Sequence, residues 1–106
     1  MSEEPSLEQI SRRIVAAFGP RRIALFGSRA RGDAGIDSDI DLLIEMPSEL
    51  PAAERIRAID RLFTPRTWPL DLVVLTPEEA AAQRSSRNSL VRTAEREGKV
   101  LYERSG

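Results

Sequence analysis

Residues 27–41, GSRARGDAGIDSDID, lie between two short apolar runs that are expected to form strands. The run 22–26 is apolar on both faces, and the run 39–44 alternates so that Asp39 and Asp41 share one face. Because side chains of a strand repeat every second residue, these two aspartates project together with Cα atoms about 6.7 Å apart. Gly27 and Ser28 are expected to form a strand-to-helix turn whose backbone N–H groups suit an anion. The segment therefore predicts a polyphosphate and a divalent metal ion held side by side.

Apolar spacing outside this segment predicts helices and strands in alternation, which indicates an α/β fold. Helical spacing covers residues 6–18 and 51–63, a helix is expected to begin after Thr76, and a last helix is expected over 86–97. Strands are expected at 22–26, 39–44, 70–75 and 99–102, with a helical turn at 29–31. A strand such as 22–26, apolar on both faces, belongs inside a sheet that helices cover. Ser6 and Thr76 are predicted N-caps, since each precedes a Gln or Glu by three residues.

Length and composition limit the classes of protein that this chain can represent. The 106 residues, with a net charge of −1, are expected to form a single domain over 1–106. No apolar run approaches the roughly 18 residues of a membrane helix, and the first residues lack the apolar core of a signal peptide. Cysteine and histidine are absent, which excludes thiolate metal sites and the commonest general base. Catalysis is left to carboxylates, hydroxyls and arginines, and the near-neutral charge offers no track for nucleic acid.

Asp71 adds a third carboxylate, within a strand-like run that is otherwise apolar. Aspartate is disfavoured in strands, yet the expected strands contain Asp39, Asp41 and Asp71. Two carboxylates about 4 Å apart also repel by roughly 4 kcal/mol at an effective dielectric of about 20. A bound Mg²⁺ removes this repulsion, because hard cations take oxygen ligands. A purely structural explanation stays open, in which Asp39 lies in a turn, Asp41 is solvated and Asp71 pairs with an arginine. The Gly-Ser turn upstream favours the metal site.

Other polar and aromatic residues receive smaller roles. Arg29 is a candidate phosphate ligand, because its guanidinium donors fit phosphate oxygens, and Arg31 is a second one. The remaining residues of note are expected to serve structure, as loop caps, a turn hydroxyl or packing side chains: Asp33, Asp37, Ser38, Trp68 and Tyr102.

The motif spacing resembles that of a known family. Gly27-Ser28, ten further residues and then Asp39-Ile40-Asp41 are similar to the signature of minimal nucleotidyltransferases (MNT), the partners of HEPN toxins in the polymerase-beta-like superfamily. The segments LFGSRARG (25–32), SDIDLL (38–43), LDLVV (70–74) and EGKVLYE (97–103) carry the likeness, which covers almost the whole chain. The resemblance implies a palm-like nucleotidyltransferase fold. This fold is a small mixed, twisted sheet with helices mainly on one face and the three aspartates on the open face.

The resemblance also implies roles for individual residues. Asp39 and Asp41 would bind one or two catalytic Mg²⁺ ions, and Asp71 would be the third metal-binding and catalytic carboxylate, which helps to activate the attacking hydroxyl. Gly27 and Ser28 would hold the β- and γ-phosphates of ATP, with Arg29 as a further nucleotide contact. In the family, a nucleoside monophosphate passes to an acceptor hydroxyl and pyrophosphate leaves.

Three functions follow as hypotheses. The first is Mg²⁺-dependent transfer of AMP from ATP to a tyrosine hydroxyl of a HEPN-type toxin, which makes the chain a cytoplasmic antitoxin. Because larger relatives complete their substrate site with an extra helical domain, the acceptor surface is expected from a partner or from a second copy in a homo-oligomer. The alternatives are an antitoxin that neutralises its partner by binding alone, and adenylyl transfer to a small molecule. Neither a membrane nor direct nucleic-acid binding is expected.

Overall fold

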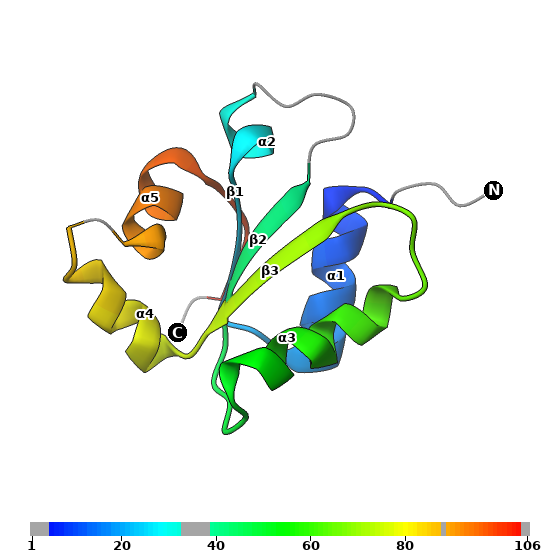
Figure 1. The fold of residues 1–106 in the computed structure, drawn as a ribbon, viewed down its shortest axis with the longest axis horizontal. Helices are drawn as coiled ribbons and strands as arrows, with labels where there is room; N and C mark the ends of the chain where they lie inside the picture. The colour runs from blue at the N-terminus through cyan, green and yellow to red at the C-terminus, as the bar shows by residue number, and fades with distance from the viewer. Residues whose placement is uncertain (1–4, 33–38, 88, 105–106) are drawn as a thin grey trace.

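The strands form one mixed sheet in the computed structural model, which describes residues 5–32, 39–87 and 89–104, with only the backbone of Ser28 and Arg31. These residues form four strands in the order β3-β2-β1-β4 (Figure 1). Their bounds are β1 (Arg22–Phe26), β2 (Ile40–Glu45), β3 (Leu70–Leu75) and β4 (Lys99–Glu103). β1 is antiparallel to β2 and β4, whereas β2 and β3 are parallel. The predicted mixed sheet and α/β class are confirmed.

Helices lie on both sides of this sheet (Figure 1). α1 (Leu7–Phe18), α3 (Ala52–Asp60) and the 3-10 turn η1 (Arg61–Phe63) pack on one face, over the larger cluster of buried apolar side chains. α4 (Pro77–Arg84) and α5 (Leu90–Glu97) lie over the other face, where Leu43, Val91 and Ala94 form a smaller cluster. Most of the core therefore lies on one face, whereas the helices are divided between the two faces. The face that carries Asp41 and Asp71 is not fully open to solvent. Its other residues, such as Leu43, are apolar, and α4 and α5 cover them.

Capping side chains set the helix boundaries. Ser6 and Thr76 each form the predicted capping box at the start of α1 and α4. Gly19 ends α1 in the left-handed conformation, with φ 58°. The expected start of the last helix at residue 86 is wrong, because the Ser89 hydroxyl accepts the Arg92 N–H at 3.1 Å and so caps a helix that begins at Leu90.

The remaining local predictions have mixed outcomes. A short helix, α2 (Ser28–Arg31), follows β1 as expected. Trp68 and Tyr102 pack against the larger apolar cluster, which confirms their structural role. The roles expected of Asp33, Asp37 and Ser38 fall outside the described residues. Within the described ranges, no helix has the length and apolar character to cross a membrane.

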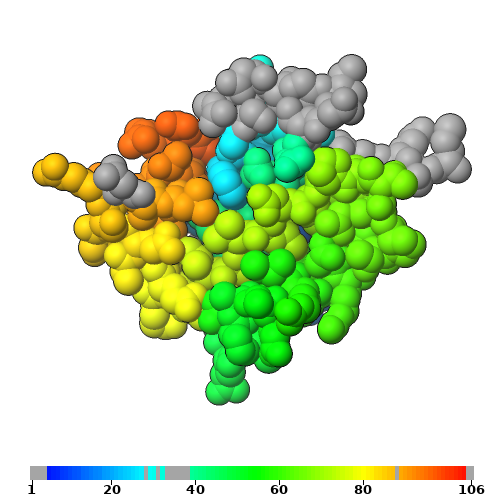
Figure 2. All heavy atoms as spheres, in the orientation of Figure 1, coloured from blue at the N-terminus to red at the C-terminus, as the bar shows by residue number. Residues whose placement is uncertain are grey.

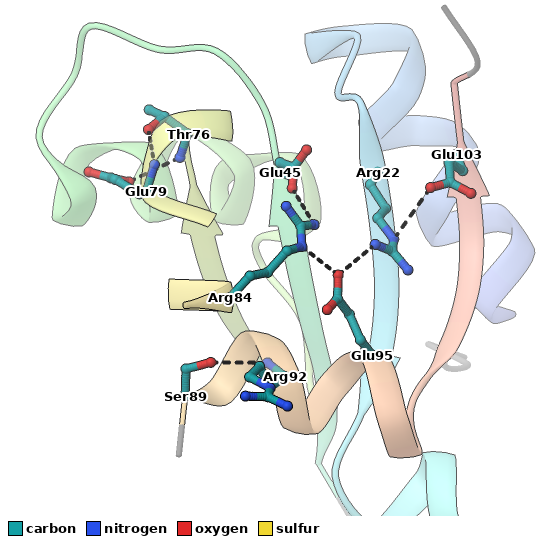
Figure 3. A network of polar contacts seen from close by, with 9 residues as sticks. All are labelled: Arg22, Glu45, Thr76, Glu79, Arg84, Ser89, Arg92, Glu95 and Glu103. Atoms are coloured by element: carbon teal, nitrogen blue, oxygen red, sulfur yellow. Dashed lines mark hydrogen bonds and ion pairs between the residues drawn. The ribbon is translucent and has the colours of Figure 1, made fainter. Parts of the chain in front are cut away.

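A chain of ion pairs ties α4 and α5 to the sheet (Figure 3). Arg22 of β1 lies 3.8 Å from Glu103 of β4 and 3.2 Å from Glu95 of α5. Arg84 of α4 lies 2.6 Å from the same Glu95 and 3.1 Å from Glu45 of β2. Because each charge meets an opposite one, the network fixes both helices at the end of the sheet away from Asp41.

Candidate active site

The parallel pairing of β2 and β3 brings two of the predicted carboxylates together. Asp41 lies directly beside Asp71 in the register, and Phe26 of β1 is the partner of Asp41 on its other side. Neighbouring strands are about 4.8 Å apart, so Asp41 and Asp71 project side by side from one face. Asp41 is half-buried, whereas Asp71 is exposed. Asp39 is also exposed and comes directly before β2.

Negative charge accumulates at Asp41. Burial raises the pKa of this carboxyl above its usual value, and the charges of Asp71 and Asp39 raise it further. The Arg29 guanidinium opposes this effect and lowers the pKa of Asp41. Three carboxylates and one arginine thus influence each other within one site. The site disfavours the ionised form of its most buried carboxylate, and a bound cation would relieve this penalty.

Gly27 brings the turn after β1 against Asp41. Its φ is 78°, a left-handed conformation that residues with a Cβ rarely adopt. A Cβ at this position would overlap Asp41 Oδ2 and lie 3.2 Å from Asp41 Cγ. The missing side chain therefore leaves the room that the Asp41 carboxylate occupies. The Gly27 carbonyl also accepts the Ala30 N–H at 3.1 Å, which starts the turn of α2.

The donor set fits a hard divalent cation but does not form a complete coordination shell. Among the described residues, no group of three or more Asp, Glu, His or Cys side chains is arranged closely enough to hold a metal ion. Of the three carboxylates predicted as metal ligands, Asp41 and Asp71 lie side by side in neighbouring strands. Asp39 is near enough to raise the pKa of Asp41. Mg²⁺ commonly takes one or two carboxylates and completes its octahedron with water and phosphate oxygens. Asp41 and Asp71 suit that mode of binding.

The predicted phosphate ligands are placed in part. The backbone from Gly27 to Arg31 forms the expected turn and short helix after β1. The side chains of Ser28 and Arg31 lie outside what the structure describes, so their expected contacts stay predictions. Arg29 is half-buried and close enough to lower the pKa of Asp41, and its contact with a phosphate stays a prediction.

Sequence reasoning missed one element that borders the site. The segment 64–69 connects η1 to β3 and ends at Pro69, whose carbonyl accepts the Ile40 N–H at 3.2 Å. This contact fixes the segment to the start of β2, next to the aspartates. Figure 2 shows the start of β2 in teal between the orange of α5 and the light green of the segment before β3. No local sequence pattern indicates this contact, because it depends on β3 becoming the neighbour of β2.

Two solved structures have a similar fold. A candidate nucleotidyltransferase from Sulfolobus solfataricus is 24% identical, with a TM-score of 0.64 over 92% of this chain and 77% of that one. A toxin–antitoxin complex with AMP-PNP contains a chain that is also 24% identical, with a TM-score of 0.66 over 94% of this chain and 76% of the other. At this level of identity, the likeness shows a common fold.

The family assignment comes from the sequence as a whole. No curated protein matches this chain. The family described as nucleotidyltransferase domain matches residues 7–101, which include the Gly27 turn, Asp39, Asp41 and Asp71. The match runs from the first residue of α1 to the third residue of β4. The chain therefore belongs to the nucleotidyltransferase domain family.

Proposed function

We propose that this chain is a Mg²⁺-dependent adenylyltransferase that moves AMP from ATP to a tyrosine hydroxyl of a HEPN-type toxin and thereby acts as its antitoxin. The observation that carries the proposal is the Asp41–Asp71 pair beside the Gly27 turn. The family match supports nucleotidyl transfer in general. The toxin partner is suggested by the likeness to a chain from a toxin–antitoxin complex with AMP-PNP. A reaction that uses ATP places the chain in the cytoplasm.

The order of the groups across the sheet suits this transfer. The Gly27 turn follows β1, Asp41 lies in the neighbouring β2, and Asp71 lies in β3 at the sheet edge. In the proposed complex the β- and γ-phosphates of ATP lie at Gly27 and Ser28, with Arg29 as a further cation. The α-phosphorus then lies over Asp41, and the acceptor hydroxyl approaches from the side of Asp71. Attacking and leaving groups are thereby placed on opposite sides of the phosphorus, as an in-line displacement requires.

Each residue has a separate task in the proposed reaction. Asp41 and Asp71, with Asp39 beside them, would hold one or two Mg²⁺ ions, which neutralise charge on the phosphate oxygens when bound. Asp71 accepts the proton of the attacking hydroxyl, and its exposure lets this proton pass to solvent. The hydroxyl oxygen forms a bond to the α-phosphorus while the bond to the bridging oxygen breaks. AMP stays on the acceptor and pyrophosphate leaves.

Incubation with α-labelled ATP, Mg²⁺ and the protein encoded by the neighbouring gene tests the activity. We expect label on a tyrosine of that protein, and loss of labelling with Asp41→Asn or Asp71→Asn. Glu78→Gln is the matched control, because it removes an exposed carboxylate on α4, outside the site. Folded wild-type protein that transfers no label would overturn the proposal.

Neutralisation by binding alone remains the second hypothesis from the sequence, and one double variant separates it from catalysis. Asp39→Asn with Asp41→Asn removes the carboxylate directly before β2 and the one at the second residue of β2, without changing the size of either side chain. An enzyme loses neutralisation of the toxin in this variant, whereas a protein that acts by binding alone keeps it. Transfer to a small molecule, the third hypothesis, predicts labelled product in the absence of any partner protein.

A further inference from the structure

Apolar side chains lie beside Asp41 and Asp71 on the same face of the sheet. Phe26 of β1 is the register partner of Asp41, and partners in neighbouring strands project from one face. Val73 follows Asp71 by two residues and therefore projects from this face as well. Both apolar side chains are half-buried and pack against the smaller apolar cluster beneath α5. The two carboxylates thus adjoin an apolar surface that is open in part.

One flank of α5 extends this surface. Glu95 lies on the other flank, which contacts the ion-pair network at the end of the sheet away from Asp41 (Figure 3). Because a helix has 3.6 residues per turn, Leu90 and Thr93 lie on the flank opposite Glu95, toward the carboxylates. Both residues are half-buried. We call the uncharged surface formed by the following four residues the apolar strip: Phe26, Val73, Leu90 and Thr93.

Gly98 holds α5 against β1 at one end of the apolar strip. Its N–H donates to the Ala94 carbonyl at 2.7 Å. A Cβ at Gly98 would overlap the carbonyl oxygens of Ala94 and of Leu25, the residue before Phe26. The helix and the strand therefore meet without room for a side chain between them. The apolar strip is thus fixed in place, and a ligand that binds there does not have to order α5.

The apolar strip lies in a direction that the nucleoside of a bound ATP can take. In the proposed complex, attack and departure run across the strands, from the side of Asp71 to the Gly27 turn. The other substituents of the α-phosphorus are its non-bridging oxygens and the O5′ of the ribose, so the nucleoside extends along the strands or away from the sheet. One direction along the strands leads past Asp39, whose charge raises the pKa of Asp41. The other leads to the apolar strip, where an uncharged nucleoside can bury apolar surface.

We propose that the apolar strip is the nucleoside subsite of this transferase, where side chains of β1, β3 and α5 pack against the ribose and the base of the bound nucleotide. The inference rests on the proposed function, because it places the nucleoside relative to phosphates at the Gly27 turn. Position and charge both favour this occupant: the apolar strip adjoins Asp41 and Asp71, and it carries no charge. A nucleoside held there restricts rotation about the α-phosphate and keeps the bond that breaks in line with the attacking hydroxyl.

Two ligands that differ by the nucleoside test the apolar strip. Inorganic tripolyphosphate carries the phosphates of ATP without the nucleoside, and calorimetry with Mg²⁺ gives the Kd of each ligand. We expect Val73→Phe, which fills the apolar strip, to raise the Kd of ATP at least about tenfold and that of tripolyphosphate less than about twofold. Val100→Phe is the matched control, because it makes the same exchange in β4 at a residue that is 49% exposed. It should leave both Kd values unchanged.

Thr93→Trp fills the apolar strip from α5 instead of β3 and should give the same result as Val73→Phe. An unchanged Kd of tripolyphosphate shows in each variant that the fold and the phosphate site are intact. An equal rise for ATP and tripolyphosphate in both variants, or no rise for ATP in either, overturns the proposal. Absence of ATP binding to the wild type overturns it as well.

Steady-state kinetics with the protein of the neighbouring gene separate this inference from the proposed activity. Val73→Phe should raise the KM for ATP and leave the KM for the acceptor protein unchanged. A raised KM for the acceptor alone would place the acceptor on the apolar strip and overturn the inference. A selective loss of ATP binding in the variants, without transfer by the wild type, supports the nucleoside subsite and contradicts the proposed activity. Transfer with an unchanged KM for ATP in both variants supports the activity and contradicts the subsite.

Discussion

Gly27 is the residue at which backbone conformation and site chemistry meet. Alanine at this position would hold a φ of 78° and overlap the Asp41 carboxylate. A left-handed conformation costs a residue with a Cβ about 1–2 kcal/mol, and overpacking adds roughly 1–3 kcal/mol. We therefore expect Gly27→Ala to lower the free energy of unfolding by about 2–5 kcal/mol, as measured by urea denaturation.

Gly32 provides a matched control for this variant. Its φ is 80°, but a Cβ at Gly32 would meet no atom of the described residues within 4 Å. Gly32→Ala therefore carries only the backbone cost, about 1–2 kcal/mol. The difference between the two variants measures the contact of Gly27 with Asp41. Equal losses of stability would show that the Asp41 carboxylate moves aside without penalty.

Among the elements, α3 and β3 are joined by the buried cation Arg55. This side chain is 6% exposed and donates to the carbonyls of Leu50 and Val74 at 2.8 and 3.2 Å. It also pairs with Glu79 of α4 at 2.7 Å. Because lysine cannot reproduce a planar fork of donors, Arg55→Lys should leave buried carbonyls unsatisfied.

We expect Arg55→Lys to lower the free energy of unfolding by about 2–3 kcal/mol, the cost of one or two unsatisfied buried groups. Arg57→Lys makes the same exchange at an exposed position of α3 and should change stability by less than about 0.5 kcal/mol. Thermal or urea unfolding compares the two. Equal stability of both variants would mean that Arg55 only fills space.

The network through Arg84 gives α4 and α5 a dependence on pH. The hydrogen bond from Arg84 lowers the pKa of Glu95 below its usual value near 4.5, more than burial raises it. A lowered pKa in the folded state means that the network stabilises the protein fully above pH 4.5, and that this contribution is lost as the pH falls through the lowered value.

Arg84→Gln should therefore lower the free energy of unfolding by about 1 kcal/mol at pH 7, because it removes a partly exposed network of ion pairs. The loss should be smaller in acid, where Glu95 is protonated and the network no longer contributes. Urea unfolding at pH 7 and at pH 3 measures how far the difference in stability between wild type and Arg84→Gln decreases in acid. Arg96→Gln on α5 is the control, because Arg96 contacts Glu97 at 3.4 Å and its side chain is 67% exposed. A difference between Arg84→Gln and wild type that stays constant with pH would contradict the role of Glu95.

Across the whole molecule, local patterns could be predicted and distant pairings could not. The caps at Ser6 and Thr76 and the bounds of β1 and β3 follow from residues close in sequence. The pairing of Asp41 with Asp71 depends on which strands become neighbours, and no local pattern fixes that. The burial of Arg55 likewise depends on carbonyls of two other segments.

Binding of Mg²⁺ and ATP should stabilise the whole chain, because the proposed ligands come from three neighbouring strands. A ligand at a hundred times its Kd adds about 2.7 kcal/mol, and each kcal/mol raises the Tm of a domain of this size by roughly 4–8 °C. We expect a rise of about 10 °C or more for wild type with both ligands, measured by calorimetry, and little with ATP and EDTA.

Asp41→Asn should abolish that rise and yet melt no lower than wild type when both ligands are absent. Burial and the charges of Asp71 and Asp39 disfavour the ionised Asp41 in the folded protein, and asparagine removes this penalty without changing the shape of the side chain. Glu78→Gln should respond to the ligands like wild type. A full rise in the Tm of Asp41→Asn would place the metal elsewhere, whereas a lower Tm without ligands would make Asp41 a structural carboxylate. A gain of stability without ligands, together with loss of the response to them, is expected only where a binding site conflicts with the fold that holds it.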